Sequence, residues 1–222
     1  MANSINNSKR ITIDLIRHGE PEGGDIVRGR VNPVLTETGW RQMQQAVGLG
    51  AECLPSSTTP GWTHLVSSPL LRCQQFAARL GETAGLDVAV IEDWQEIDYG
   101  DWDGMPATEW RKIAAEQFRA FRQDLSALAP PNGENFLQFR DRVLAAWNQL
   151  SQYEDGAHLL LVTHGGVMRV ILPTVLGMPL NRSFPLHIPF ACFSRVVVEV
   201  RDDKTHASLV FHNAAEHDSY PA

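Results

Sequence analysis

Cysteine is scarce in this sequence, and its three cysteines, Cys53, Cys73 and Cys192, form no Cys-x-x-Cys pair. The spacing favours neither a disulfide framework nor a zinc site, and it fits a reducing, cytoplasmic location. No apolar run approaches the roughly 20 residues that span a bilayer, so no membrane partner is expected. Residues 1–10 are polar and lack the apolar core of a secretory signal, and we expect them to be poorly ordered.

Basic charge is also in short supply. The chain has 19 lysines and arginines against 26 aspartates and glutamates, a formal net charge of −7. A nucleic-acid partner is therefore not expected, and an anionic ligand would need local positive charge. Internal repeats, linkers and breaks in composition are absent as well, which predicts a single domain over residues 1–222.

Apolar segments that favour strands alternate with segments that favour helices. Strands are expected at 11–16, 64–67, 88–91 and 159–162, with a closing hairpin at 194–200 and 206–211. Helices are expected at 36–53, 68–85, 106–122, 134–151 and 165–176, with Pro173 kinking or shortening the last. This order predicts an α/β three-layer sandwich, with a mostly parallel central sheet and helices on both faces. The segment 104–152 is expected to form a helical cap.

The strand Ile13–Ile16 stops at Arg17, His18 and Gly19. Open α/β sheets bind ligands at the carboxyl ends of their strands, so this rigid edge is a natural place for chemistry. A neutral histidine is a competent nucleophile, and nearby positive charge favours the neutral form. The pattern therefore predicts His18 as a nucleophile and Arg17 as a phosphate ligand.

Further polar residues follow other predicted strands: Arg72, Glu96 and His164. Two arginines and two histidines can surround a phosphoryl group with charge-assisted donors. The helix that opens at Gly165 offers free N–H groups to an anion. Glu96 is the candidate proton donor, since burial favours a neutral carboxyl.

Each of these signals has a plainer interpretation when it is taken alone. A short Arg-His-Gly tripeptide arises by chance, and His164 alone would more often be a structural histidine. Arg72 would usually be solvated or ion-paired, and Glu96 is one of several acids in its loop. Glu134 fits the first turn of a helix, where the helix dipole favours an acid. It is their order along the chain that favours a shared site.

Six stretches in this order resemble the histidine phosphatase (phosphoglycerate mutase-like) superfamily. They are Leu15–Glu20, Leu35–Gly39, Ser67–Cys73, Glu96–Gly104, Asn132–Glu134 and Val162–Gly166, and the resemblance covers about residues 11–212. It implies a phosphoglycerate mutase-like fold and a phosphorylated His18. Arg17, Arg72, His164 and Gly165 would bind the phosphoryl oxygens, and Glu96 would act as acid and then as base. No metal or cofactor is implied.

Within the superfamily, residues 95–106 and 163–169 most resemble the α-ribazole-5′-phosphate phosphatases of cobalamin biosynthesis. One departure is Gly24, which stands where many members have a phosphate-contacting asparagine, so Arg28 or Arg30 is expected to reach the substrate instead. The expected partner is a small phosphorylated metabolite, and the protein is expected to be a monomer or a homodimer. A phosphoglycerate mutase and a non-catalytic phosphate-binding member of the family remain as alternatives.

Overall fold

The computed structural model describes residues 8–48, 61–202 and 204–213. Residues 1–7, which were expected to be poorly ordered, and Cys53 lie outside these ranges. Helix α1 spans Glu37–Ala46 and is capped by Thr36, whose side chain accepts a hydrogen bond from the Gly39 N–H. The sequence-based end of this helix, near residue 53, was therefore wrong, because Val47 already leaves the helical conformation.

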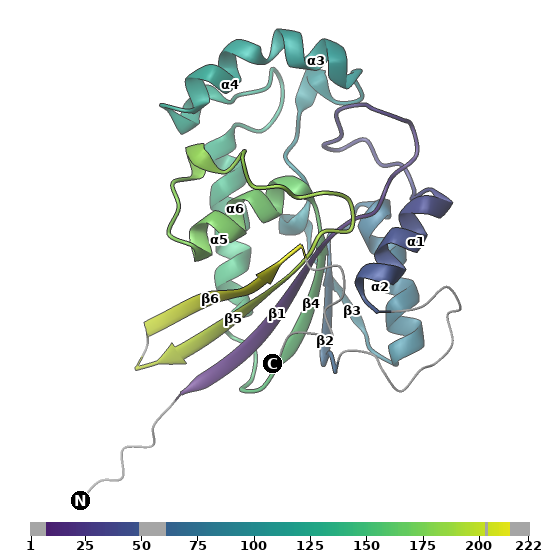
Figure 1. Ribbon diagram of the computed structural model, residues 1–222, viewed down its shortest axis with the longest axis vertical. Coiled ribbons are helices and arrows are strands. Elements are labelled where there is room, and N and C mark those ends of the chain that lie inside the picture. The colour runs from purple at the N-terminus through teal and green to yellow at the C-terminus, as the bar shows by residue number, and fades with distance from the viewer. Residues whose placement is uncertain (1–7, 49–60, 203, 214–222) are drawn as a thin grey trace, which may run out of the picture.

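The described residues form a six-stranded sheet in the order β3-β2-β4-β1-β5-β6 (Figure 1). Neighbours among the first four strands run parallel, whereas β5 runs antiparallel to both β1 and β6. The predicted mostly parallel α/β sheet with a closing hairpin is confirmed. The strands are β1 (Lys9–Arg17), β2 (His64–Ser67), β3 (Val88–Val90), β4 (His158–Thr163), β5 (Phe193–Arg201) and β6 (Lys204–His212).

Side chains of the central strands alternate between two buried layers, one on each face of the sheet. Ile13 and Leu15 of β1 lie in the core shared with α5 (Phe136–Leu150) and α6 (Gly165–Val175). Ile16 faces the opposite core, which includes residues of α1 and α2 (Leu71–Ala84). A parallel strand buried on both faces reads as a continuous apolar run, which is why the predicted three layers were visible in the sequence.

One charged side chain, Asp14, interrupts this apolar run and is fully buried. Arg195 of β5 donates to both of its carboxylate oxygens, at 2.7 and 3.0 Å, and Trp62 donates its indole N–H at 2.8 Å. Burial alone would raise the pKa of Asp14, but hydrogen bonds from His158 and Arg195 hold it below its ordinary value. A paired and hydrogen-bonded charge is the form in which a carboxylate is tolerated in a core.

The expected helix at 106–122 is two helices, α3 (Ala107–Ile113) and α4 (Ala115–Phe121). Ala114 separates them with φ −85° and ψ −6°, outside the range that propagates an α-helix, and its methyl group is fully buried. Both helices lie over the carboxyl ends of the parallel strands (Figure 1). Short 3₁₀ turns complete the connections, at Glu92–Trp94, Gly100–Trp102, Leu125–Ala127 and Leu180–Arg182.

Helix α2 begins at Leu71, later than the expected Ser68-Pro69 start. The Ser68 N–H donates to Val162 O at 3.0 Å, so Ser68 still continues the pairing with β4. The first turn is capped from a distant loop, because the Leu71 N–H donates to Asn32 Oδ1 at 2.6 Å. In α6, Pro173 lies in the last turn and the helix ends two residues later. Among the described helices, none has the length and apolar character that crossing a membrane requires.

Candidate active site

The predicted site residues lie where parallel strands end. Arg17 is the last residue of β1 and His18 follows it; His164 caps α6 directly after β4, and Arg72 lies in the first turn of α2, just after β2. Because these strands are parallel neighbours, their carboxyl ends meet at one edge of the sheet. The rings of His18 and His164 contact edge to face, with centroids 5.3 Å apart.

His18 is buried and its ring orientation is fixed by the backbone. Nδ1 lies 2.8 Å from the Gly19 carbonyl oxygen, which can only accept, so Nδ1 carries the proton and Nε2 keeps a free lone pair. Burial lowers the pKa of His18 well below 6.5, and the positive charges of Arg17 and Arg72 lower it further. The imidazole is therefore neutral near pH 7, as a nitrogen nucleophile must be.

The loop after His18 is held by a close contact between two glycines. A Cβ on Gly19 would lie 2.1 Å from Gly39 O, and a Cβ on Gly39 would lie 2.1 Å from Glu20 O. Thr36, the cap of α1, also donates its backbone N–H to Glu20 O at 2.9 Å. The stretch Leu35–Gly39 thus anchors the segment that follows the candidate nucleophile, and any side chain at these glycines would displace it.

The guanidinium groups of Arg17 and Arg72 form a cationic pocket, and protein atoms accept hydrogen bonds from only some of their donors. Arg17 donates Nη1 to Ile188 O at 2.7 Å, and its guanidinium carbon lies 4.3 Å from the centre of the Phe190 ring. Arg72 donates to Val31 O and Gly29 O, both at 2.9 Å. Within the described residues, Nε of each is buried and has no partner. Burial lowers the pKa of Arg17 to about 10, so it stays charged at pH 7, and an anion would satisfy these donors.

His164 is buried beside Arg72. Its Nε2 lies 2.7 Å from Ser68 Oγ, and Cys73 Sγ lies 3.6 Å from the same nitrogen. Burial lowers its pKa well below 6.5, and Arg72 and His18 lower it further. The cysteine itself is a thiol, because burial raises its pKa to about 12.

Glu96, which is 8% exposed, lies between two backbone donors. Its Oε1 accepts from the Ile97 N–H at 3.0 Å, and its Oε2 accepts from the Gly166 N–H in the first turn of α6 at 2.9 Å. A Cβ on Gly166 would lie 2.0 Å from Oε1, so a side chain there would displace the Glu96 carboxyl group. Each carboxyl oxygen keeps a second lone pair, which leaves room for a proton.

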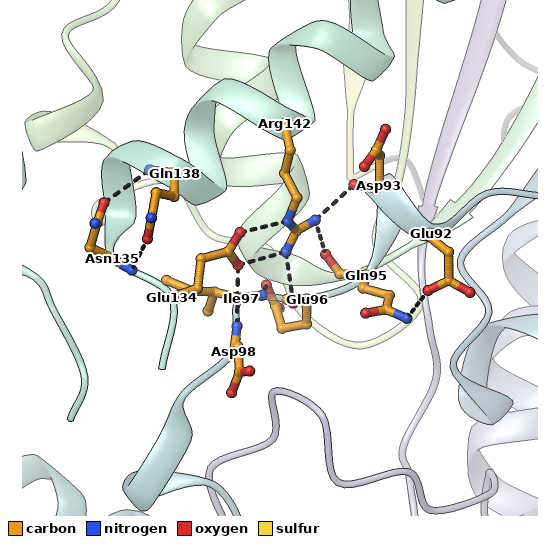
Figure 2. Close-up of polar contacts among 10 residues, drawn as sticks. All are labelled: Glu92, Asp93, Gln95, Glu96, Ile97, Asp98, Glu134, Asn135, Gln138 and Arg142. Carbon is orange, nitrogen blue, oxygen red and sulfur yellow. Dashed lines mark hydrogen bonds and ion pairs between the residues drawn. The ribbon is translucent and has the colours of Figure 1, made fainter. Parts of the chain in front are cut away.

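Arg142 of α5 fixes the loop that carries Glu96, as Figure 2 shows. It donates to the carbonyl oxygens of Asp93, Gln95 and Glu96 at 2.8 to 3.0 Å. Glu134 binds the same guanidinium through both oxygens, at 2.7 and 2.8 Å, and accepts the Asp98 N–H. Bidentate pairs of this kind fix geometry as well as charge.

Glu134 does not lie in the first turn of a helix, as its plain interpretation supposed. The cap of α5 is Asn135, which forms a capping box with Gln138, so Glu134 precedes the helix and is free to bind Arg142. Arg142 was missed by sequence reasoning. Its only signal in the sequence was its position in the predicted helix, eight residues after Glu134.

Asp103 supports the pocket in a similar way and was also missed. Its carboxylate accepts the backbone N–H groups of Gly29, Arg30 and Val31, at 2.6 to 2.7 Å. This fixes the turn whose carbonyl groups bind Arg72. One acid of the Glu96 loop therefore holds Arg72 in place through the loop after β1.

The two arginines proposed to replace the missing asparagine lie in different places. A cavity lies beside His18, and Arg28 is part of its lining. Arg28 also donates to its own loop, at Ile26 O, Glu22 O and Gly24 O. Arg30 does not line that cavity. Burial lowers its pKa, and the charges that act on it are those of Arg142, Glu134, Asp98 and Glu92. The geometry thus favours Arg28 over Arg30 as a substrate contact.

A cavity of about 440 Å³ opens at this edge of the sheet, and Arg72 and His164 lie behind it, outside its lining. Arg17, His18, Glu96, Gly165 and Gly166 form one part of its lining, and Arg28 and Arg169 also contribute. This size is typical of a small-molecule site. In the part of the chain that the structure describes, no three His, Cys, Asp or Glu side chains are grouped so as to hold a metal ion.

We expect the protein to lose stability in mild acid because of its two buried histidines. The pKa values of His18 and His164 are lowered in the fold, so the unfolded chain binds more protons below pH about 6.5. The free energy of unfolding therefore decreases as the pH is lowered. At pH about 5.5 each histidine should cost on the order of 1 kcal/mol relative to neutral pH. Urea unfolding in phosphate-free buffer at both pH values measures this loss.

The matched variants are His18→Gln and His206→Gln, since His206 is exposed on β6. The first should lose less stability between the two pH values than the wild type, and the second should lose as much. An equal loss in all three proteins would show that His18 is not held neutral.

The sheet order and the buried cationic pocket at its strand ends place this chain among α/β proteins with a site suited to an anion. The chain belongs to the histidine phosphatase superfamily (branch 1), whose family model matches residues 13–212. This confirms the resemblance seen in the motifs.

The relatives carry several names. "Bifunctional protein Rv2228c" of Mycobacterium tuberculosis (strain H37Rv) is 34% identical over 182 residues, which are 81% of this chain and 48% of that protein. The chain therefore spans about half the length of the first curated relatives it matches. The adenosylcobalamin/alpha-ribazole phosphatase of Escherichia coli K12 is 28% identical over 190 residues, 82% of this chain and 87% of that one.

A solved structure agrees with the fold. The mycobacterial glucosyl-3-phosphoglycerate phosphatase Rv2419c superimposes with a TM-score of 0.72 at 26% sequence identity. The match covers 94% of this chain and all of that one. It confirms the expected fold class.

Proposed function

We propose that this protein is a metal-independent phosphomonoesterase that acts through a phosphohistidine on a small phosphorylated metabolite. The observation that carries the proposal is the neutral His18, with Nε2 free, in a pocket that also holds the unsatisfied Nε donor of Arg17. Phosphoryl transfer needs mainly positioning and charge stabilisation, and this pocket offers both.

In the proposed reaction, His18 Nε2 attacks phosphorus and the ester oxygen leaves with a proton from Glu96. Arg17, Arg72 and His164 stabilise the charge on the three phosphoryl oxygens, and the Gly165 N–H at the start of α6 adds a donor. Glu96, now a carboxylate, takes a proton from water as the water attacks the phosphohistidine. Inorganic phosphate leaves, and His18 and Glu96 return to their starting states.

The finer proposal concerns the substrate. The motifs at 95–106 and 163–169 and the E. coli relative's name support α-ribazole-5′-phosphate. The mycobacterial structure's name points to a different phosphorylated compound, so α-ribazole-5′-phosphate is one candidate within the proposed class.

The test is to trap the intermediate. The protein is mixed with a radiolabelled aryl phosphate in buffer containing EDTA, and turnover is stopped with alkali, in which phosphohistidine is stable. We expect labelled phosphate on the peptide that contains His18 and a matching release of inorganic phosphate. Turnover without label on this peptide would overturn the mechanism. Isomerised phosphoglycerate without released phosphate would show a mutase, and phosphate binding without turnover of any ester would show a non-catalytic protein.

A further inference from the structure

The part of the cavity away from the phosphate pocket is lined by aromatic rings. Trp110 and Phe118 come from the cap helices α3 and α4, Phe136 and Phe139 from the start of α5, and Phe184 from the segment before β5. These elements are far apart in the sequence, and α3 and α4 lie over the strand ends in Figure 1. The phosphate pocket and the rings therefore share one cavity.

The rings form a continuous edge-to-face series. From Tyr99 the centroid distances are 5.9 Å to Trp110, then 5.1 Å to Phe118 and 5.2 Å to Phe184. The series continues from Phe184 through the buried Phe121 to Phe136, at 5.5 and 4.7 Å. Edge-to-face geometry is a preferred packing of aromatic pairs. An aromatic ring of a ligand that enters the cavity could therefore pack in the same way against the rings that line it.

Two aromatic rings of the lining remain exposed to solvent. Phe184 is 45% exposed and Phe190 is 36% exposed. Exposed phenylalanine at the lining of a cavity is typical of a ligand site, because its apolar surface is buried only when a ligand binds.

Several charged groups of the cavity have partners in the protein or lie at the phosphate end, although the buried Arg28 Nε has no partner within the described residues. Arg111 faces Asp25 at 3.8 Å, and Arg28 donates to carbonyl groups of its own loop. Arg169 Nη1 and Arg17 Nε both lie 3.2 Å from where a Cβ on Gly165 would be, which places Arg169 beside the phosphoryl donors. A leaving group that carries its own charge would thus find charged partners mainly at the phosphate end, whereas among the rings the buried Trp110 Nε1–H is a donor with no partner within the described residues.

We propose that the enzyme prefers phosphomonoesters whose leaving alcohol carries an aromatic ring, which packs among Trp110, Phe118 and Phe184. This inference rests on the proposed phosphatase function, and it assigns the cap to recognition of the leaving group. An aromatic ring should favour binding and turnover by about ten-fold over a short alkyl group, from buried apolar area and ring contacts.

The test compares esters whose leaving alcohols have similar acidity, so that reactivity does not decide the result. The substrates are 3-phenylpropyl, 3-cyclohexylpropyl and propyl phosphate, with 3-phosphoglycerate as a charged competitor. We expect kcat/KM to be highest for the phenyl ester, chiefly through a lower KM. Equal values for the phenyl and propyl esters, or a higher value for 3-phosphoglycerate, would overturn the proposal. Equal values for the phenyl and cyclohexyl esters would overturn its aromatic part.

The variants are Phe184→Ala and Phe118→Leu, with Ile113→Ala as the control. Ile113 belongs to α3 and is 50% exposed, but it does not line the cavity. We expect the phenyl-to-propyl ratio of kcat/KM to fall about five-fold in each aromatic variant and to stay unchanged in the control. An unchanged ratio in both aromatic variants would overturn the assignment.

Calorimetric binding of 3-phenylpropylphosphonate and propylphosphonate separates this inference from the proposed function, because neither compound can be hydrolysed. Tighter binding of the phenyl compound without turnover of any ester would support the aromatic subsite and overturn the phosphatase proposal. Turnover of the esters with equal binding of both phosphonates would do the reverse.

Discussion

Replacing His18 with alanine is expected to lower kcat for phosphomonoesters by at least about 10⁴-fold, as loss of a covalent nucleophile does in other enzymes. The reason is geometric, since the Nδ1 proton is bound to Gly19 O and Nε2 is the atom left to attack phosphorus. Phosphate release from an aryl phosphate under saturating conditions measures the effect.

The control for this variant is His206→Ala, which removes an exposed histidine of β6. It should retain wild-type turnover. Wild-type turnover in His18→Ala would end the proposal that this histidine is the nucleophile, provided circular dichroism shows that both variants are folded.

A second large effect is expected from Glu96→Gln, and its size should depend on the substrate. General acid catalysis contributes about 10²- to 10⁴-fold, and the contribution matters most when the leaving oxygen is a poor one. We expect a loss in this range for an alkyl phosphate and a much smaller loss of phosphohistidine formation with p-nitrophenyl phosphate, whose oxygen leaves without a proton. Rapid-quench kinetics on both substrates measures the difference.

Glu92→Gln is the matched control, because Glu92 lies in the same loop, is exposed, and its carboxylate accepts a hydrogen bond from the Gln95 side chain. It should leave both substrates unaffected. If Glu96→Gln slows both substrates by the same factor, Glu96 positions the phosphoryl group instead of supplying a proton.

Much of the fold could be predicted from local signals. The strand that ends at Arg17 is apolar on both faces, and Thr36 is a recognisable helix cap, so each appears within a few neighbouring residues. The end of α1 and the break at Ala114 could not be predicted, because both depend on how the chain turns toward a core that the local sequence does not describe.

Some residues of the candidate site could likewise be predicted from the sequence, and others could not. His18, Arg72, Glu96 and His164 follow predicted strands, and parallel topology alone is enough to bring them to one edge. Arg142 and Asp103 act on backbone groups that are 46 to 74 residues away in the chain. Nothing in the residues around them indicates such a contact, so these supports become visible only when the fold is known.

The separation between strand ends and cap has a consequence for how such an enzyme could diversify. The groups proposed to bind phosphate come from β1, α2, the Glu96 loop and the start of α6, whereas the rings come mainly from α3, α4 and the segment before β5. Since the two sets occupy different stretches of chain, substitutions in the cap can alter which alcohol is accepted while the phosphoryl machinery is inherited unchanged. Substrate range and reaction chemistry are thus free to evolve at different rates, and an engineer can redesign the first without rebuilding the second.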